Sequence, residues 1–389
     1  MKKRAIVLVH GYEKVEQNTF THRLKDGLTY YTDGIDKDFE PDPVDHDGIL
    51  VERLTAQART AGAPKIQIDL YEAYWADMIP TEIPGSIWQR VGRGGMLLAY
   101  WFLGGLARRI IGLRGFLPTT LGISLALSGV LLMLWYLSLL MLAAKAVVAD
   151  PNNLPVWLQN ALTAAPTDAK TSIQDFAVSM VKSVEQTPWW AIVSGMLAGL
   201  PADKVASVAE FAKAYLTDER VGEVPAGLRA RTKRRLVTLL EQIYASKDPY
   251  DEIFVIGHSL GSAIALDALA DYGDDRARTY FLTWGSPLRV LCAQEPQIEQ
   301  ERKKMLAATP PLANWTDCIA MSDFIGACVP GHQDAWGAEN VIWVTLPRGF
   351  LGGFNISSHG DYYRTEQTLK MLLEPAKTRQ PLQPETPTP

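Results

Sequence analysis

The stretch that most constrains the fold lies at residues 253–266. It reads I-F-V-I-G-H-S-L-G-S-A-I-A-L, so a β-branched and aromatic run enters a serine between two glycines, and an alanine-rich run leaves it. This order predicts a buried strand, a tight turn and a helix, with Ser259 in the turn. Gly257 and Gly261 lack the Cβ atoms that would collide where strand and helix approach. Because the helix directs its positive end toward the turn, we interpret Ser259 as a nucleophile.

Strand patterns occur toward both ends of the chain. Residues 4–9 (R-A-I-V-L-V) and 65–75 are predicted to be strands, and residues 51–60 are interpreted as a helix. The strand pattern returns at 251–257, 279–283, 318–321 and 341–346. Strands that alternate with helices predict an α/β fold, in which a mostly parallel sheet carries helices on both faces.

The middle of the chain has a different character, because residues 83–247 show helical patterns only. Residues 115–144 contain no charged residue, and about 20 apolar residues suffice for a helix to cross a bilayer. We therefore expect a large helical, membrane-associated insertion with its hydrophobic segment at about 95–148. It would divide an α/β core into residues 1–82 and 248–374. Residues 375–389, rich in proline and polar side chains, are predicted to be a disordered tail.

The two halves of one sheet must lie on the same side of any membrane. The insertion must then cross an even number of times, and we expect a helical hairpin or a monotopic anchor. Residues 95–113 are the best candidate for the second arm, and residues 189–200 suit an interfacial position. Arg108, Arg109 and Arg114 precede the uncharged run and only Lys145 ends it, which favours a cytoplasmic core.

Composition narrows the possible partners. The chain has 38 basic and 43 acidic residues, a balance that does not favour a nucleic-acid binder. Its three cysteines form neither a disulfide framework nor a metal-ligand spacing, and no phosphate-binding loop is present, so we predict no cofactor and no metal. Residues 229–235 hold five basic side chains, which we interpret as either a solvated helix face or a contact with anionic lipid headgroups.

A nucleophilic serine needs a histidine to accept its proton and a carboxylate to orient that histidine. In a sheet of this kind the chain order is serine, acid, histidine. Of the two later histidines, we prefer His359, which follows the strand at 341–346 and a glycine-rich loop, over His332. Asp323 ends the predicted strand at 315–321 and is the preferred acid, with Asp317 and Asp334 as alternatives.

The tetrahedral intermediate of acyl transfer needs backbone N–H donors for its oxyanion. One donor is expected from Leu260, directly after the nucleophile, and the other from Tyr12 in the loop that follows the first strand. His10 and His258 each flank a turn glycine, and we expect them to support the site by hydrogen bonding rather than by proton transfer.

Five segments together resemble the α/β-hydrolase superfamily on its lipase-like side. They are V-L-V-H-G at 7–11, V-I-G-H-S-L-G-S at 255–262, T-W-G-S-P-L at 283–288, S-D-F-I-G at 322–326 and S-H-G-D-Y-Y at 358–363. The resemblance implies the α/β-hydrolase fold, with the nucleophile Ser259, the acid Asp323, the base His359, and the oxyanion donors Tyr12 and Leu260.

The expected function is that of a membrane-associated serine hydrolase that cleaves carboxylic esters, with lipid or phospholipid acyl esters as substrates. An acyltransferase or thioesterase would use the same residues, and a non-catalytic membrane module on a hydrolase fold is the alternative from another class.

Overall fold

The computed structural model describes residues 1–59, 62–80, 86–112, 119–149, 202–222, 224–272, 277–307, 312–347, 356–374 and 376, with short pieces between 159 and 183. Contacts divide the chain into two units. We call residues 1–79, 109–124 and 214–389 the sheet unit, and residues 80–108 and 125–213 the helical unit. The predicted interfacial segment at 189–200 and nearly all of the predicted tail lie outside the described residues.

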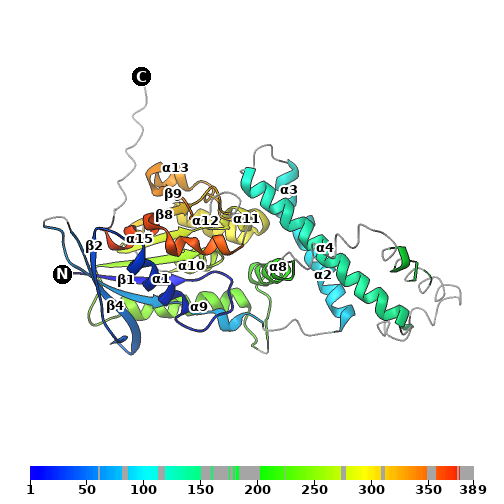
Figure 1. The fold of residues 1–389 in the computed structure, drawn as a ribbon, viewed down its shortest axis with the longest axis horizontal. Helices are drawn as coiled ribbons and strands as arrows, with labels where there is room; N and C mark the ends of the chain where they lie inside the picture. Colours follow the sequence, from blue (N-terminus) through cyan, green and yellow to red (C-terminus); the bar gives the residue numbers. More distant parts are fainter. Residues whose placement is uncertain are drawn as a thin grey trace, which may run out of the picture. The chain divides into compact units, whose positions relative to one another are not determined.

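The sheet unit is built on a nine-stranded sheet to which both ends of the chain contribute (Figure 1). Eight strands follow the order β2-β4-β5-β1-β6-β7-β8-β9, and β3 pairs with β4. Neighbouring strands from β5 to β9 are parallel, while β4 is antiparallel to β2, β3 and β5. The strands are β1 (Lys2–Val9), β2 (Ile35–Phe39), β3 (Val44–His46), β4 (Ile49–Ala58), β5 (Ile66–Glu72), β6 (Glu252–His258), β7 (Thr279–Trp284), β8 (Asn314–Ile319) and β9 (Val341–Trp343).

Helices cover both faces of this sheet. Ile6 and Leu8 of β1 belong to a core cluster that also contains residues of α1 (Thr19–Tyr30) and α15 (Glu366–Leu373). Side chains alternate along a strand, so the equally buried Val7 and Val9 belong to the opposite face. There α10 (Gly261–Asp271) packs on β1 and β6 and contacts α9 (Leu228–Tyr244) and α12 (Pro296–Ala307). The predicted α/β class with a largely parallel sheet is therefore confirmed.

Shorter helical elements complete the sheet unit. They are η1 (Ala76–Met78), α11 (Leu288–Gln294), α13 (His332–Trp336), η3 (Ala338–Asn340) and η4 (Ile356–Arg364).

The predicted helix at 51–60 is wrong, because these residues lie in β4. Glu52, Leu54, Ala56 and Gln57 favour helix locally, but the segment pairs with β2 on one side and β5 on the other. Long-range pairing thus overrides local propensity. The strand expected at 318–321 begins earlier, at Asn314, and ends at Ile319. The strand expected at 341–346 is shorter, and β9 ends at Trp343.

The connectivity of the sheet identifies one position for a site. The next strand parallel to β1 along the chain is β5, which lies on one side of β1, whereas the strand after β6 is β7, on the opposite side. Strands β1 and β6 are neighbours, so the connections leaving their carboxyl ends diverge. In open α/β sheets, ligands bind at the crevice that such a divergence leaves at the carboxyl ends of the strands.

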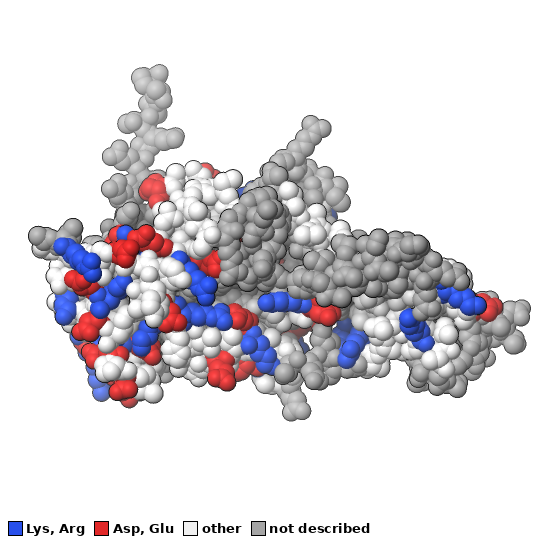
Figure 2. Space-filling model, viewed as in Figure 1, with Lys and Arg blue, Asp and Glu red and all other residues white. Residues whose placement is uncertain are grey.

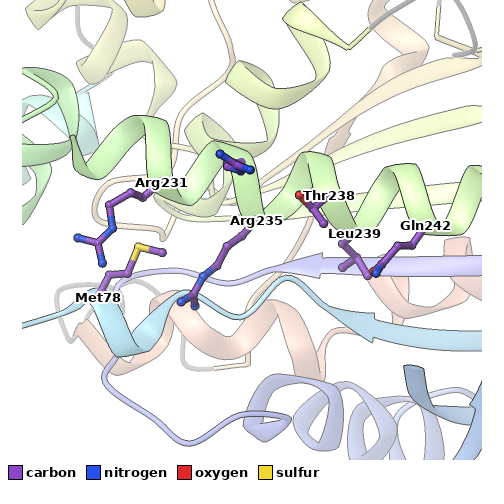
Figure 3. Close-up of a pocket in the computed structure, with 7 residues that line it drawn as sticks. Met78, Arg231, Arg235, Thr238, Leu239 and Gln242 are labelled. Carbon is purple, nitrogen blue, oxygen red and sulfur yellow. The ribbon is translucent and has the colours of Figure 1, made fainter. Parts of the chain in front are cut away.

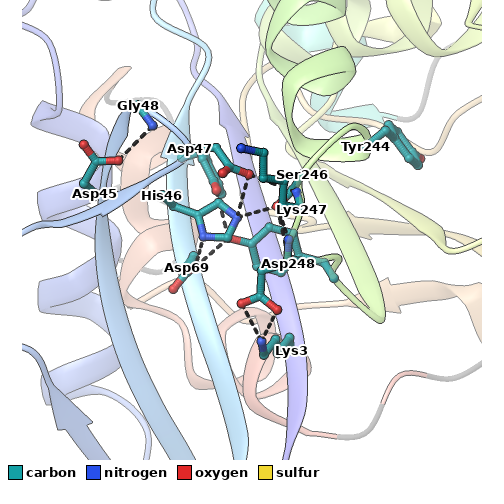
Figure 4. A network of polar contacts seen from close by, with 12 residues as sticks. Lys3, Asp45, His46, Asp47, Gly48, Asp69, Tyr244, Ser246, Lys247 and Asp248 are labelled. Atoms are coloured by element: carbon teal, nitrogen blue, oxygen red, sulfur yellow. Dashed lines mark hydrogen bonds and ion pairs between the residues drawn. The ribbon is translucent and has the colours of Figure 1, made fainter.

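A buried polar network holds β4 and β5 to the loop after α9 (Figure 4). Asp69 of β5 is fully buried and accepts two hydrogen bonds from Arg53 of β4, at 2.6 and 2.7 Å. The Tyr250 hydroxyl donates to the same carboxylate at 2.5 Å. His46 contacts Ser246 at 2.9 Å, which links β3 to the same loop. The charge of Asp69 is therefore paired and hydrogen-bonded, as a buried charge must be.

The helical unit contains α2 (Ile87–Leu103), most of α4 (Thr119–Ala149) and most of α8 (Ala202–Leu216), while α3 (Gly105–Gly112) divides between the two units. A Cβ on Gly94 would meet the Tyr136 ring at 2.8 Å, and one on Gly129 would meet the Phe102 ring at 3.3 Å. An earlier residue of α2 thus contacts a later residue of α4, and the two helices form an antiparallel hairpin.

One helix among the described residues, Leu121–Ala149 within α4, is long and apolar enough to cross a membrane. Several of its large apolar side chains are exposed, among them Leu127, Val130, Met133 and Leu142. In Figure 2 the face of the sheet unit in view carries interspersed charges of both signs.

Candidate active site

Ser259 lies in the turn between the end of β6 and the start of α10, and its backbone is strained. Its φ of +54° lies in the left-handed region, which non-glycine residues rarely adopt. The Ser259 N–H donates to the carbonyl of Trp284 at 3.0 Å, and this bond fixes the turn to the end of β7. Strain of this kind persists only where the surrounding structure holds it, and it gathers at functional sites.

The two glycines beside Ser259 permit the close packing of this turn. A Cβ on Gly257 would lie 2.5 Å from the Cα of Ser262, and one on Gly261 would lie 2.0 Å from the carbonyl oxygen of Val9. Neither position can hold a larger residue unless the backbone moves. The predicted reason for both glycines, close approach of strand and helix, is confirmed, and Gly261 also brings α10 against the end of β1.

The loop after β1 lies directly against the serine. A Cβ on Gly11 would come within 2.8 Å of the Ser259 Cβ and 3.4 Å of its Oγ. The peptide between Gly11 and Tyr12 is therefore next to the hydroxyl, where an oxyanion donor must be. Leu260 occupies the N-cap of α10, so its N–H lies outside the hydrogen-bond ladder of the helix.

His10 supports this loop rather than contacting the serine. Its ring is stacked between Phe20 and Trp75, with ring centroids 4.6 Å apart on each side. Its Nδ1 lies 2.8 Å from the Gly11 carbonyl oxygen, which must accept the hydrogen bond. Burial lowers the pKa of His10 to about 4, so the ring is neutral near pH 7. Because N–H and C=O point in opposite directions across a trans peptide, holding the Gly11 carbonyl also orients the Tyr12 N–H.

The predicted acid and base lie together. His359 in η4 places Nδ1 2.9 Å from both carboxylate oxygens of Asp323, in the turn after β8. The Tyr362 hydroxyl donates to Oδ2 of the same carboxylate at 2.9 Å, and the Ile325 N–H donates to Oδ1 at 3.1 Å. Burial alone would raise the pKa of Asp323, but the His359 imidazole and the backbone N–H groups of Ile325 and Gly326 bring it below its usual range. Asp323 is therefore an ionised hydrogen-bond acceptor that orients His359.

The other ring nitrogen of His359 is the atom that a general base would use. Nε2 is buried and has no hydrogen-bond partner in the described part of the chain. A buried polar atom without a partner is uncommon in a native structure. With Nδ1–H directed at Asp323, Nε2 carries the lone pair, which is the tautomer that accepts a proton from a serine.

His258 fixes the position of His359 from the nucleophile side. The two imidazole centroids are 4.9 Å apart, and the His258 Nε2–H donates to the His359 carbonyl at 2.8 Å. Burial lowers the pKa of His258 to about 3, so it does not take up protons near pH 7. Since His258 precedes Ser259 in the chain, this bond holds the histidine loop beside the nucleophile turn.

The alternative residues lie elsewhere. Asp317 is buried and accepts hydrogen bonds from Thr283 and from the Val329 N–H, at 2.6 and 2.8 Å. His332, the histidine that was not preferred, is fully buried in α13 with Nε2 3.0 Å from the Trp315 carbonyl oxygen. Asp334 is exposed on the same short helix. These contacts account for Asp317 and His332 as structural residues.

Two contributors were not anticipated from the sequence. Tyr362 is fully buried, donates to Asp323 and accepts the Ala320 N–H at 3.1 Å. Its place three residues after His359, within S-H-G-D-Y-Y, is the sequence signal that could have identified it. Glu72 lies at the end of β5 with Oε1 4.0 Å from His10 Nε2. Burial raises the pKa of Glu72 to about 7, and no pattern in the sequence indicates this.

Among the described residues, no group of three or more His, Cys, Asp or Glu side chains is arranged to hold a metal ion. Comparison of the chain with models of known protein families, with curated proteins and with solved structures found no match.

Proposed function

We propose that this protein is a membrane-associated serine hydrolase of the α/β-hydrolase fold that cleaves carboxylic esters. Ser259 is the nucleophile, His359 the base and Asp323 the acid. The observation that carries the proposal is the buried imidazole of His359, which Asp323 orients through Nδ1 and whose backbone carbonyl is bonded by His258, the residue before the strained Ser259. His258 and His332 also have a buried ring nitrogen with no partner among the described residues, but the other nitrogen of each bonds a backbone carbonyl, whereas Nδ1 of His359 bonds a carboxylate.

The reaction follows from these positions. The Ser259 hydroxyl proton passes to His359 Nε2 as Oγ adds to the ester carbonyl, and the carbonyl electron pair moves onto its oxygen. The N–H groups of Tyr12 and Leu260 stabilise that oxyanion. As the tetrahedral intermediate collapses, the alcohol leaves with the proton from His359 and an acyl-enzyme remains. Water then gives a proton to Nε2 and adds to the acyl carbon, after which the carboxylic acid leaves and Ser259 regains its proton.

The proposed membrane attachment rests on the α2–α4 hairpin. Helix α4 has 31 residues and extends about 46 Å, more than the hydrocarbon core of about 30 Å. In α2 and α3, the segment without charges runs only from residue 94 to 107, about 21 Å, too short to span. We therefore favour an anchor that enters and leaves on one face of the membrane, with the sheet unit on the cytoplasmic side. Protease cleavage of residues 1–80 and 250–375 from opposite faces of sealed vesicles would refute this topology.

A hydrolase held at a bilayer meets lipid acyl esters, which we propose as the substrate class. An acyltransferase would form the same acyl-enzyme and pass the acyl group to an acceptor other than water. A thioesterase would form it from a thioester instead of an ester. The orientation of His359 by Asp323 argues against a non-catalytic binding module, which has no use for an oriented base.

Hydrolysis of p-nitrophenyl esters of graded chain length tests the proposal. The purified full chain should hydrolyse them, with a preference among chain lengths that reports the acyl site, and Ser259→Ala should abolish turnover. Full activity in Ser259→Ala would exclude the mechanism. Formation of an acyl-enzyme that water releases slowly and a thiol or alcohol releases rapidly would favour the acyltransferase.

A further inference from the structure

The five basic residues at 229–235 divide into two groups according to their contacts. Arg229 forms two hydrogen bonds with the buried Asp267, both at 2.6 Å. Lys233 pairs with Asp271. Arg235 donates to both oxygens of Asp77, at 2.6 and 2.7 Å, and to the Tyr74 carbonyl at 2.8 Å. These three cations are neutralised by carboxylates of the fold itself.

Arg231 and Arg234 are different, because neither has a carboxylate partner in the part of the chain that the structure describes. Arg231 donates from one guanidinium nitrogen to the Val221 carbonyl at 2.9 Å, which positions the side chain without cancelling its charge. Arg234 is exposed, and no hydrogen bond or ion pair joins it to the described residues. Like charges one turn apart on a helix repel each other, so this pair costs stability unless an anion lies between them.

Both arginines line one surface pocket of about 410 Å³ (Figure 3). Its wall on α9 is formed by side chains spaced along one face of the helix, and Met78 of η1 faces them. Figure 3 shows Arg231 and Arg235 extending from α9 toward the turn that carries Met78. The lining residues are Met78, Arg231, Arg234, Arg235, Thr238, Leu239 and Gln242. The pocket thus combines guanidinium and neutral polar donors with two apolar side chains.

We propose that this pocket binds a phosphate group, carried either by a phospholipid headgroup or by a soluble phosphate compound. Guanidinium groups match phosphate oxygens with paired, charge-assisted hydrogen bonds, which makes arginine the preferred residue for phosphate recognition. With three arginines and, among the described residues, Asp77 alone to offset them, the pocket keeps two positive charges that no described carboxylate compensates, although the whole chain has a net charge of −5.

The pocket lies at the edge of the sheet where Ser259 lies. Arg235 donates to the Tyr74 carbonyl, and Trp75, the next residue, stacks on His10 at the start of the loop after β1. A phosphate bound here would therefore lie at the carboxyl edge of the strands. The inference does not depend on Ser259 being a nucleophile, because it concerns binding alone.

Vesicle flotation of the full chain tests the lipid source. The probes are vesicles of phosphatidylcholine and vesicles in which about a third of the lipid is phosphatidylglycerol, at low salt. The hairpin should bind both kinds. Arg231→Gln/Arg234→Gln should lower the extra affinity for the anionic vesicles by about 10- to 30-fold, as expected for two cations near the surface. The control variant Lys65→Gln/Lys303→Gln removes the same charge from exposed residues elsewhere in the sheet unit. It should change the extra affinity for anionic vesicles by no more than about 3-fold.

Titration with inorganic phosphate, followed by ³¹P NMR line width, tests the soluble source with the same variants. If the arginine variant loses only the extra affinity for anionic vesicles, the pocket binds lipid headgroups. If it loses only the saturable binding of inorganic phosphate, the pocket binds a soluble phosphate compound. The proposal is overturned if the arginine variant matches the lysine variant in both experiments. The single variant Arg234→Gln is the control for misfolding, because it alters an exposed side chain that contacts no described residue through a hydrogen bond or ion pair.

Discussion

The sharpest perturbation of the proposed site is Asp323→Asn, because both carboxylate oxygens are 2.9 Å from His359 Nδ1. One oxygen also accepts from Tyr362 and the other from the Ile325 N–H. The amide nitrogen of asparagine must therefore face a donor in either orientation. The simplest relief is for His359 to move its proton from Nδ1 to Nε2, which leaves no lone pair to accept the serine proton.

The expected fall in kcat of Asp323→Asn has two causes, the loss of a hydrogen bond to a charged carboxylate and the wrong tautomer of His359. A hydrogen bond to a charged group is worth about 1.5–3 kcal/mol, and here it would stabilise the imidazolium that forms during attack. Reversal of the tautomer adds a comparable cost. Together they amount to about 4 kcal/mol, or roughly a 10³-fold fall in kcat. Tyr362→Phe removes one neutral donor from the same carboxylate and should lower kcat by about 10-fold.

The matched control is Asp317→Asn, which alters another buried aspartate, on strand β8. Asp317 bonds Thr283 and Val329 and has no bond to His359. The variant should lose stability yet keep kcat within about 3-fold when assayed below its melting temperature. We would measure kcat on p-nitrophenyl butyrate for all three variants, with circular dichroism melts to establish folding. The reasoning fails if Asp317→Asn loses activity as severely as Asp323→Asn, or if Asp323→Asn retains it.

Three further variants test the surroundings of the site. His10→Phe keeps an aromatic ring between Phe20 and Trp75 but removes the hydrogen bond to the Gly11 carbonyl. The kcat of this variant should fall about 10- to 100-fold with little change in KM. An equal rise in KM would mean that His10 acts in substrate binding instead. Burial raises the pKa of the Glu72 carboxyl from 4.5 to about 7, so the folded chain binds the Glu72 proton more tightly than the unfolded chain does. The free energy of unfolding should therefore fall by up to roughly 3 kcal/mol as the pH rises from about 4.5 to 7. Urea melts of Glu72→Gln should lack this part of the pH dependence, and curves parallel to the wild type would contradict the assignment. Arg53→Met leaves the buried Asp69 without its ion pair and should lower the free energy of unfolding by about 3–5 kcal/mol, which a change under 1 kcal/mol would refute.

The parts of the fold that the sequence predicted are those whose signal is local. Runs such as residues 5–9 and 253–257 carry no polar side chain because their strands are buried on both faces. Ser259 could be placed in a turn because two glycines and a change of periodicity bracket it. His359 and Asp323 could be selected by their order relative to the strands, and the structure brings these two side chains together. Their catalytic roles stay predictions.

The parts that the sequence did not predict depend on contacts between distant residues. Strand β4 is defined by its pairing with β2 and β5, which no local pattern in residues 49–58 indicates. Helix α1 has a helical pattern in its sequence, because the apolar residues Phe20, Leu24 and Leu28 recur at every fourth position and are buried. The polar residues around them made this pattern hard to recognise. The burial of His332 and the raised pKa of Glu72 arise from tertiary packing alone.

Labelling with a fluorophosphonate probe tests the central claim most directly, because the reagent reacts with a serine only where a base and an oxyanion site activate it. The full chain should gain one adduct, mapped by mass spectrometry to Ser259, and His359→Ala should slow labelling at least 100-fold. A chain that takes up no adduct, or takes it up on another residue at an unchanged rate in Ser259→Ala, would contradict the proposal.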